Sequence, residues 1–201
     1  AAFGKQHPTV AICLNNLAQL LRHTNRIEEA EPLMRRALEI DEAAFGEQHP
    51  NVVRDLNNLA MLLKNTAHRT EAESLVRRAL KICESAFDKK HPTVAICLNN
   101  LATLLQDTNP SEEAEPLMRR ALEIDEAAFG KQHPTVAIDL NNLATLLQDT
   151  NRHEEAEPLI RRSLDILDSF RRQTGHEHPH FQQVNENYQI LQRAMGSNEP
   201  D

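Results

Sequence analysis

The sequence is short of several residue types, and each shortage excludes a class of protein. Lysine and arginine number 22 against 30 aspartate and glutamate residues, for a net charge of −8, which excludes a basic surface for DNA or RNA. No apolar run reaches the ~18–20 residues of a membrane span, and no signal peptide is visible. Glycine-rich phosphate loops, nucleophile elbows and HExxH motifs are also missing. We therefore expect no enzyme, no cofactor and no metal.

Cysteine is scarce as well. The three cysteines form no CxxC pair, and Cys13 and Cys97 are the same position of a repeat, two repeats apart, which is too far for a disulfide. We interpret them as free, buried thiols in a reducing cytoplasm.

What the sequence does have is a period of 42 residues. The segment 7–18 returns almost unchanged from His91 and from His133, with a looser copy from His49. Such a period indicates a solenoid, in which each unit buries its apolar face against its neighbours. Residues 1–6 match residues 127–132, so we expect the chain to be a piece of a longer protein. The predicted divisions are the end of a preceding repeat (1–6), four repeats (7–48, 49–90, 91–132 and 133–177), a C-terminal capping helix (178–195) and a disordered tail (196–201).

Each repeat is predicted to form two helices. Apolar residues recur at helical spacing in residues 9–23 and again from about residue 26 to residue 45. Asn25, followed by Glu28 three residues later, predicts a capping box at the start of the second helix, and Asn109 and Asn151 repeat the signal. Gly46 and Gly130 stand where left-handed C-caps are expected.

The small residues Ala18, Ala30 and Ala37 recur in later units and occupy the positions at which a tetratricopeptide repeat keeps its helices close. The 42-residue period, the Asn-Asn-Leu-Ala, Glu-Ala-Glu-Pro-Leu and Arg-Arg-Ala-Leu-Glu-Ile segments and the His-Pro restart resemble kinesin light chain repeats over residues 1 to about 177. Bacterial kinesin light chains, which accompany bacterial tubulins, share this aromatic-poor form. The resemblance implies an all-α tetratricopeptide solenoid of antiparallel helix pairs, forming a right-handed superhelix whose first helices line a concave groove.

Most charged residues fall on the second helices, where glutamate and arginine alternate. Residues 9–23 contain one charged residue, Arg22, whereas residues 26–45 contain nine. We interpret this as a solvated, ion-paired outer face. The recurring histidines lie one repeat apart, roughly 10 Å, which excludes a shared metal site. His176, His178 and His180 are interpreted as a structural loop.

The first helices carry the predicted binding residues. Asparagine is a poor residue inside a helix, yet each first helix contains an Asn-Asn pair. By resemblance, the second residue of each pair is structural and the first faces the groove, where an amide can bind peptide backbone. Alternatively, all eight are structural. The predicted groove residues are Ile12, Asn15, Gln19, Arg22, Arg54, Asn57, Met61, Lys64, Ile96, Asn99, Thr103, Gln106, Ile138, Asn141, Thr145 and Gln148.

Comparison of two copies of the repeat suggests positions at which different repeats contact different ligand side chains. The units 7–48 and 91–132 differ at six positions, three of which (Gln19/Thr103, Arg22/Gln106 and His23/Asp107) face the groove in the family geometry. Drift at tolerant surface positions is the simpler explanation.

Three functions remain open. The first is a non-catalytic adaptor that binds an extended peptide or partner protein in the groove. The second is an accessory of a cytoskeletal filament, such as a bacterial tubulin polymer, bound through loops or the outer face. The third is a scaffold that regulates an enzyme domain elsewhere in a longer chain. All three make the partner a protein, with no nucleic acid and no membrane, and leave the oligomeric state open.

Overall fold

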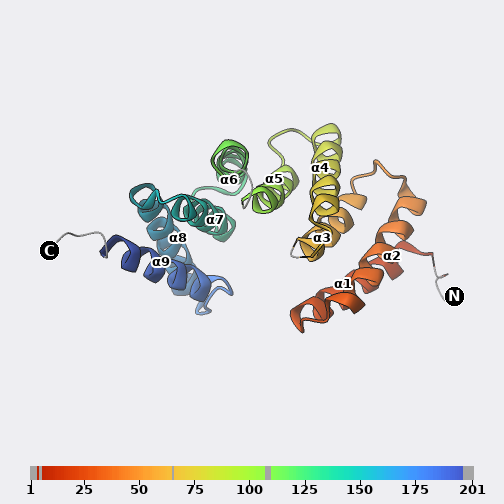
Figure 1. The fold of residues 1–201 in the computed structure, drawn as a ribbon, viewed down its shortest axis with the longest axis horizontal. Helices are drawn as coiled ribbons and strands as arrows, with labels where there is room; N and C mark the ends of the chain where they lie inside the picture. The colour runs from red at the N-terminus through yellow and green to blue at the C-terminus, as the bar shows by residue number, and fades with distance from the viewer. Residues whose placement is uncertain (1–3, 5, 65, 107–109, 197–201) are drawn as a thin grey trace. The chain divides into compact units, whose positions relative to one another are not determined.

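The computed structural model describes residue 4 and residues 6–64, 66–106 and 110–196. Over these residues the chain is all-helical, without strands, as predicted. Nine α-helices and one π-helical turn follow one another along it (Figure 1). They are α1 Pro8–His23, α2 Ile27–Phe45, α3 Val52–Leu63, α4 Arg69–Ala86, α5 Pro92–Leu105, η1 Pro110–Ala114, α6 Glu115–Phe129, α7 Pro134–Asp149, α8 His153–Thr174 and α9 Phe181–Gly196. No helix within these ranges combines the length and the apolar composition that crossing a bilayer requires.

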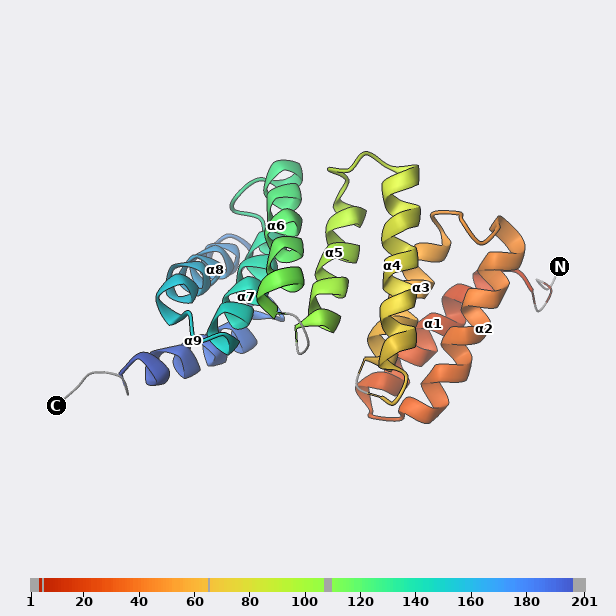
Figure 2. The ribbon, with the colours of Figure 1, turned by 45° about the horizontal axis from the view of Figure 1, so that its top comes forward.

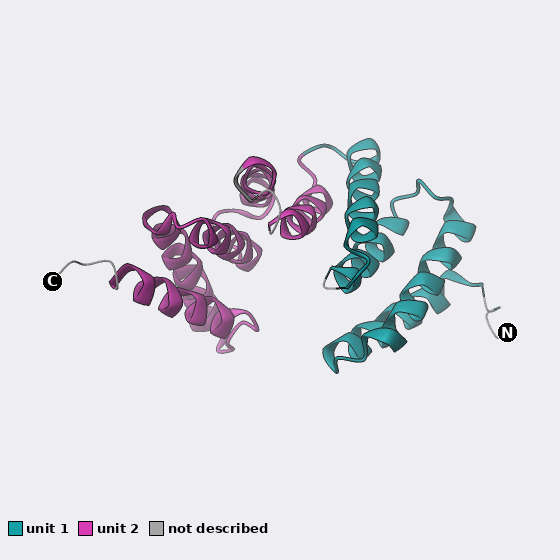
Figure 3. Cartoon of the chain, viewed as in Figure 1, with its two compact units in different colours: residues 1–89 teal, residues 90–201 magenta. Residues whose placement is uncertain are grey.

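The helices divide into two compact units, Ala1–Lys89 and Lys90–Asp201 (Figure 3). In unit 1, α1 packs on α2, α2 on α3 and α3 on α4, so two helix hairpins lie side by side (Figure 2). In unit 2, α5, α6, α7 and α8 pack in the same succession, and α9 packs on both α8 and α7. Each hairpin corresponds to one 42-residue repeat. The hairpins stack because a helix pair can bury its apolar face only against its neighbours.

Small side chains hold each hairpin together. Ala18 on α1 and Ala30 and Ala37 on α2 have no exposed surface, and their counterparts in the other repeats are equally buried. A methyl side chain lets two helix backbones approach closely, and Ile40 packs with Ala11 and Ala37 between the two helices of the first hairpin. The predicted role of the recurring alanines is therefore confirmed. The counterparts are Ala60, Ala72, Ala79, Ala102, Ala114, Ala121, Ala144 and Ala156, with Ser163 at the last position.

The predicted capping boxes at Asn25 and Asn151 are wrong. Both residues have positive φ, 58° and 59°, and they end the first helix rather than start the second. The Arg26 N–H donates to Leu21 O and the Asn25 N–H donates to Arg22 O, which is a Schellman C-cap with asparagine in the left-handed position usually taken by glycine. Arg26 then becomes the N-cap of α2, without a side-chain cap. Asn109 lies outside the described residues.

The glycines and histidines mark the long turns between repeats. Gly46 and Gly130 have positive φ as expected, but ψ near 150° rather than the left-handed helical value, a combination that only glycine adopts easily. In the turn that follows, His133 Nδ1 accepts a hydrogen bond from the Thr135 N–H, and His7 and His91 do the same. The recurring histidines are therefore helix caps.

The first and last helices differ from the internal ones. Leu17 and Leu20 on α1 are 48% and 61% exposed, whereas Leu59 and Leu62 at the same positions of α3 are buried against the preceding hairpin. Cys13 on α1 is exposed too, contrary to the prediction of buried thiols; Cys83 and Cys97 are buried as expected. At the other end, α9 begins three residues later than predicted and includes Gly196. The rest of the predicted tail, residues 197–201, and residues 1–3 and 5 lie outside the described residues.

Candidate partner-binding surface

In unit 1, the first helices α1 and α3 expose part of the predicted binding set. Ile12 and Arg54 are the most exposed members, at 44% and 46% (the latter for its side chain). Asn15 and Asn57 are buried instead. The other four members are half-buried: Gln19, Arg22, Met61 and Lys64. We call these four residues, together with Ile12 and Arg54, the first-helix surface of unit 1.

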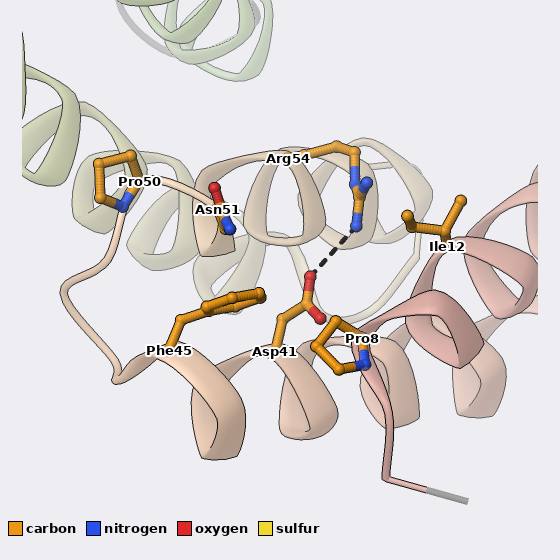
Figure 4. Close-up of a pocket in the computed structure, with 7 residues that line it drawn as sticks. All are labelled: Pro8, Ile12, Asp41, Phe45, Pro50, Asn51 and Arg54. Carbon is orange, nitrogen blue, oxygen red and sulfur yellow. Dashed lines mark hydrogen bonds and ion pairs between the residues drawn. The ribbon is translucent and has the colours of Figure 1, made fainter. Parts of the chain in front are cut away.

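Ile12 and Arg54 line one cavity of about 370 Å³ (Figure 4). Pro8 and Pro50 border it at the starts of two repeats, and Phe45 closes it from the end of α2. The lining is thus partly apolar and partly polar, with Asp41, Asn51 and Arg54 as its polar side chains. A hollow of this kind, bordered by two first helices and one second helix, can receive one side chain of a partner.

Two buried carboxyls hold Arg54 in place. Its Nη2 lies 3.2 Å from Asp41 Oδ2 on α2, and its Nε lies 2.9 Å from Asp55 Oδ1 on α3. Burial and the neighbouring Asp55 carboxyl raise the pKa of Asp41 to about 6, and Arg54 opposes that rise. Within the described residues, the third guanidinium nitrogen, Nη1, has no protein partner. That nitrogen remains available to an acceptor on a partner.

In unit 2, the corresponding helices α5 and α7 present a different chemistry. Ile96 is 54% exposed. The other members of the first-helix surface of unit 2 are half-buried: Thr103, Gln106, Ile138, Thr145 and Gln148. The three bases of unit 1, Arg22, Arg54 and Lys64, are replaced at the same repeat positions by Gln106, Ile138 and Gln148. The predicted surface is thus basic in unit 1 and neutral in unit 2.

A second cavity, of about 180 Å³, lies in unit 2 and includes residues of α9. Thr103, Gln106 and Thr145 line it beside Gln183 and Asn187. The Asn187 amide donates to Asn141 Oδ1 at 3.0 Å, just as Asn58 donates to Asn15 Oδ1 at 3.4 Å in unit 1. The helix predicted as a cap therefore occupies the place of a fifth first helix, and it covers part of the predicted binding set.

The asparagine pairs have structural partners. Asn15 Nδ2 donates to Asp55 Oδ1 at 2.8 Å, and Asn99 Nδ2 donates to Asp139 Oδ1 at 2.6 Å. Each bond joins one first helix to the next, and Asn15, Asn57 and Asn141 are at most 7% exposed. A buried amide that already holds a carboxylate is not free to bind peptide backbone. The geometry favours the structural alternative for the first asparagine of the pair.

Sequence reasoning missed the aspartates of this network. Asp41, Asp55, Asp125 and Asp139 are all buried, with at most 3% exposed surface, although the acidic residues of the second helices were predicted to be solvated. The signal was present, because aspartate rather than glutamate recurs at one position of the second helix and at one position of the first. A short carboxyl reaches only its immediate neighbours, so aspartate inside an apolar stripe indicates a buried contact.

The glutamates and arginines, by contrast, form the predicted ion-paired face. Arg35 Nη1 lies 2.6 Å from Glu71 Oε1, and Arg78 Nη1 lies 2.6 Å from Glu42 Oε1, both between second helices of adjacent repeats. Arg162 and Glu126 repeat the second of these pairs in unit 2, with Nη1 2.6 Å from Oε1. In the part of the chain that the structure describes, histidine, cysteine, aspartate and glutamate nowhere gather as three or more potential metal ligands.

Comparison with known proteins agrees with this geometry. The sequence profile described as tetratricopeptide repeat matches residues 10–51, 56–127 and 110–169. No curated protein matches the chain.

Solved structures of similar fold include BtubC (BKLC) from P. vanneervenii, with a TM-score of 0.78 and 26% identity over 94% of this chain and 74% of that one. A Podospora anserina protein with nearly identical TPR-like repeats, described as a kinesin light chain, has a TM-score of 0.73 and 20% identity over 96% of this chain and 90% of that one. The apo form of RapI has a TM-score of 0.66 and 17% identity over 94% of this chain and 72% of that one. The chain therefore belongs to the tetratricopeptide repeat family, and its structural neighbours include kinesin light chain-like proteins.

Proposed function

We propose that the chain is a non-catalytic adaptor that binds an extended peptide or a partner-protein segment along its first helices. The observation that carries the proposal is the cavity in unit 1, where the predicted residues Ile12 and Arg54 meet on the surface of two consecutive first helices. The second helices support it indirectly, because several of their charges are already engaged in ion pairs between repeats.

The two first-helix surfaces suit different parts of such a ligand. Arg22, Arg54 and Lys64 give unit 1 a positive surface, which suits acidic side chains of the partner. Gln148 gives unit 2 an amide that can donate to and accept from polar groups, whereas the Gln106 amide already donates to Asp149. The half-buried Thr103 and Thr145 use their hydroxyls on the backbone of their own helices, so we assign the contacts to Gln148 and to Ile96.

The test is a selection of extended peptides from a random library on the immobilised chain, followed by affinity measurements with variants. We expect Ile12→Ser and Arg54→Ser each to weaken the selected peptides at least about 5-fold, roughly 1 kcal/mol each. Arg36→Ser is the matched outer-face control, because Arg36 pairs only with Glu39 on its own helix at 2.9 Å, and it should leave affinity unchanged. The opposite ranking would contradict binding along the first helices.

The alternative is an accessory of a tubulin-like filament, bound through the loops or the outer face. The fold likeness to BtubC favours it, at 26% identity. Co-sedimentation with polymerised tubulin-like protein separates the two functions. In the filament case Arg36→Ser and Glu47→Lys should reduce pelleting, whereas Ile12→Ser should not.

A further inference from the structure

The most unusual feature of the interior is a carboxyl–carboxyl contact that occurs once in each unit. At the α2/α3 junction the buried carboxyls of Asp41 and Asp55 both contact the Arg54 guanidinium, at 3.2 and 2.9 Å. At the α6/α7 junction Asp125 and Asp139 are buried at the same two repeat positions, so each pair is placed for one carboxyl to hydrogen-bond the other. Two ionised carboxylates repel each other and offer no proton for such a bond. A single shared proton satisfies both groups.

The unpaired oxygens support this protonation state. Asp41 Oδ1, Asp55 Oδ2, Asp125 Oδ1 and Asp139 Oδ2 are buried and have no donor among the described residues. Each of the four carboxyls therefore has one oxygen without a hydrogen-bond donor. Buried polar atoms are rarely without a partner, so a proton between each pair is the simplest way to satisfy them.

Charged and polar side chains from neighbouring helices face the two pairs. Arg54 and Asn15 face the α2/α3 pair. Asn99 donates to the α6/α7 pair, and His133 acts on Asp125 through its charge when protonated. From α8, Ser163 donates to the Ala137 carbonyl and so satisfies backbone beside the pair, without adding charge.

The last junction shows that packing does not require carboxyls here. Leu167 on α8 occupies the repeat position of Asp125, and Val184 on α9 occupies that of Asp139 once the three-residue insertion is counted. Both are fully buried. Apolar side chains are therefore sufficient for packing at this position. The two acid pairs make their junctions sensitive to pH, which apolar residues would not do.

We propose that each unit contains a proton-dependent junction, in which one proton shared by Asp41 and Asp55 holds α2 against α3 and one shared by Asp125 and Asp139 holds α6 against α7. Loss of the proton leaves two buried like charges and loosens the packing. The effect is larger at α6/α7, because Ile138 stands there in place of Arg54. This device is independent of the proposed partner.

The pH range follows from the pKa values. Burial and the Asp125 carboxyl raise the pKa of Asp139 to about 7, and burial and Asp55 raise that of Asp41 to about 6. A carboxyl whose pKa is raised on folding binds its proton more tightly in the folded state. Its contribution to stability is complete below about pH 4, near its unfolded pKa, and is lost as the pH rises through 6 to 7.

The test compares the melting temperature of the full chain with that of Asp139→Asn between pH 5 and pH 8.5. The variant amide is neutral at every pH, and its N–H can donate to Asp125 as the acid did. We expect similar melting temperatures at pH 5 and a variant about 5 °C more stable at pH 8.5. Asp165→Asn, at an exposed position of α8, is the control and should show no such trend. A difference that stays constant with pH would overturn the proposal.

A second measurement keeps the proposal testable if Asp139→Asn fails to fold. Carbon-13 spectra of the wild-type chain with labelled aspartate carboxyls report each titration directly. We expect one carboxyl to titrate near pH 7 and another near pH 6. Titration of every aspartate below pH 5.5 would overturn the shared protons regardless of the variant.

Discussion

The α2/α3 and α6/α7 junctions are built from almost the same residues, yet one substitution gives them different electrostatics. Both place two aspartates in contact and join one of them to the asparagine of the preceding first helix. At α2/α3 the residue beside the pair is Arg54, and at α6/α7 it is Ile138. The pKa reaches about 6 for Asp41 and about 7 for Asp139. Burial is the main cause of both rises, and at α2/α3 the Arg54 guanidinium opposes the rise, so a cation at a surface position can act on a buried acid pair.

The largest difference is expected when one carboxyl is removed from each junction. Asp55→Ala deprives both Arg54 and Asn15 of an acceptor and should cost about 3 kcal/mol of unfolding free energy at pH 8. Asp139→Ala removes a carboxyl that has no cation beside it, so its cost at pH 8 should be smaller by about 1 kcal/mol or more. Urea unfolding of both variants at pH 8 measures the difference. Equal losses would mean that Arg54 contributes nothing to its junction.

Arg54→Ile should convert the first junction into the second. Removing the cation leaves the Asp41–Asp55 pair without its counter-charge, and the pKa of Asp41 should rise. Because Arg54 is half exposed, we expect a loss of about 1–2 kcal/mol at pH 8. The loss should shrink at pH 5, where the pair already holds its proton. Chemical denaturation at the two pH values gives the comparison, and a loss that is larger at pH 5 would contradict this account.

Ile138→Arg makes the opposite change in unit 2. A guanidinium beside Asp125 and Asp139 should lower the pKa of Asp139 and stabilise the ionised pair, with a gain of about 1 kcal/mol at pH 8. Ile96→Arg is the matched control, since it adds the same charge at the preceding first-helix position, whose side chain is 54% exposed. If both variants change stability equally, the gain comes from net charge rather than from the acid pair.

The smallest effect is expected at His133. Its positive charge, when present, lowers the pKa of Asp125, whereas the counterpart His49 precedes a junction that already has Arg54. His133→Asn keeps an N-cap side chain, so stability at pH 8 should change by less than about 0.5 kcal/mol. The pKa of Asp125, followed by NMR, should be higher in the variant than in the wild type, because the positive charge of His133 is gone. No movement would mean that the histidine charge does not reach the pair.

The sequence determined the fold through its periods. Apolar residues at helical spacing located the helices, and the 42-residue repeat located the hairpins, because both depend on neighbours close in the chain. Alternation of glutamate and arginine likewise located the ion-paired second helices. Asn25 and Asn151, at two of the hairpin turns, were assigned to the wrong helix end. Asn25 can serve as an N-cap or as a left-handed C-cap, and its backbone φ of 58° decides between them.

The tertiary structure alone decided the chemistry between repeats. The partners of Asn15, Asp41 and Asp139 lie on other helices, so the sequence of any one helix could not reveal whether these side chains meet solvent, peptide or one another. The cavity beside Ile12 and Arg54 likewise requires three helices to be placed together. Periodicity determines which residues share a face. Packing determines what that face touches, because burial and charge depend on groups brought together across the chain.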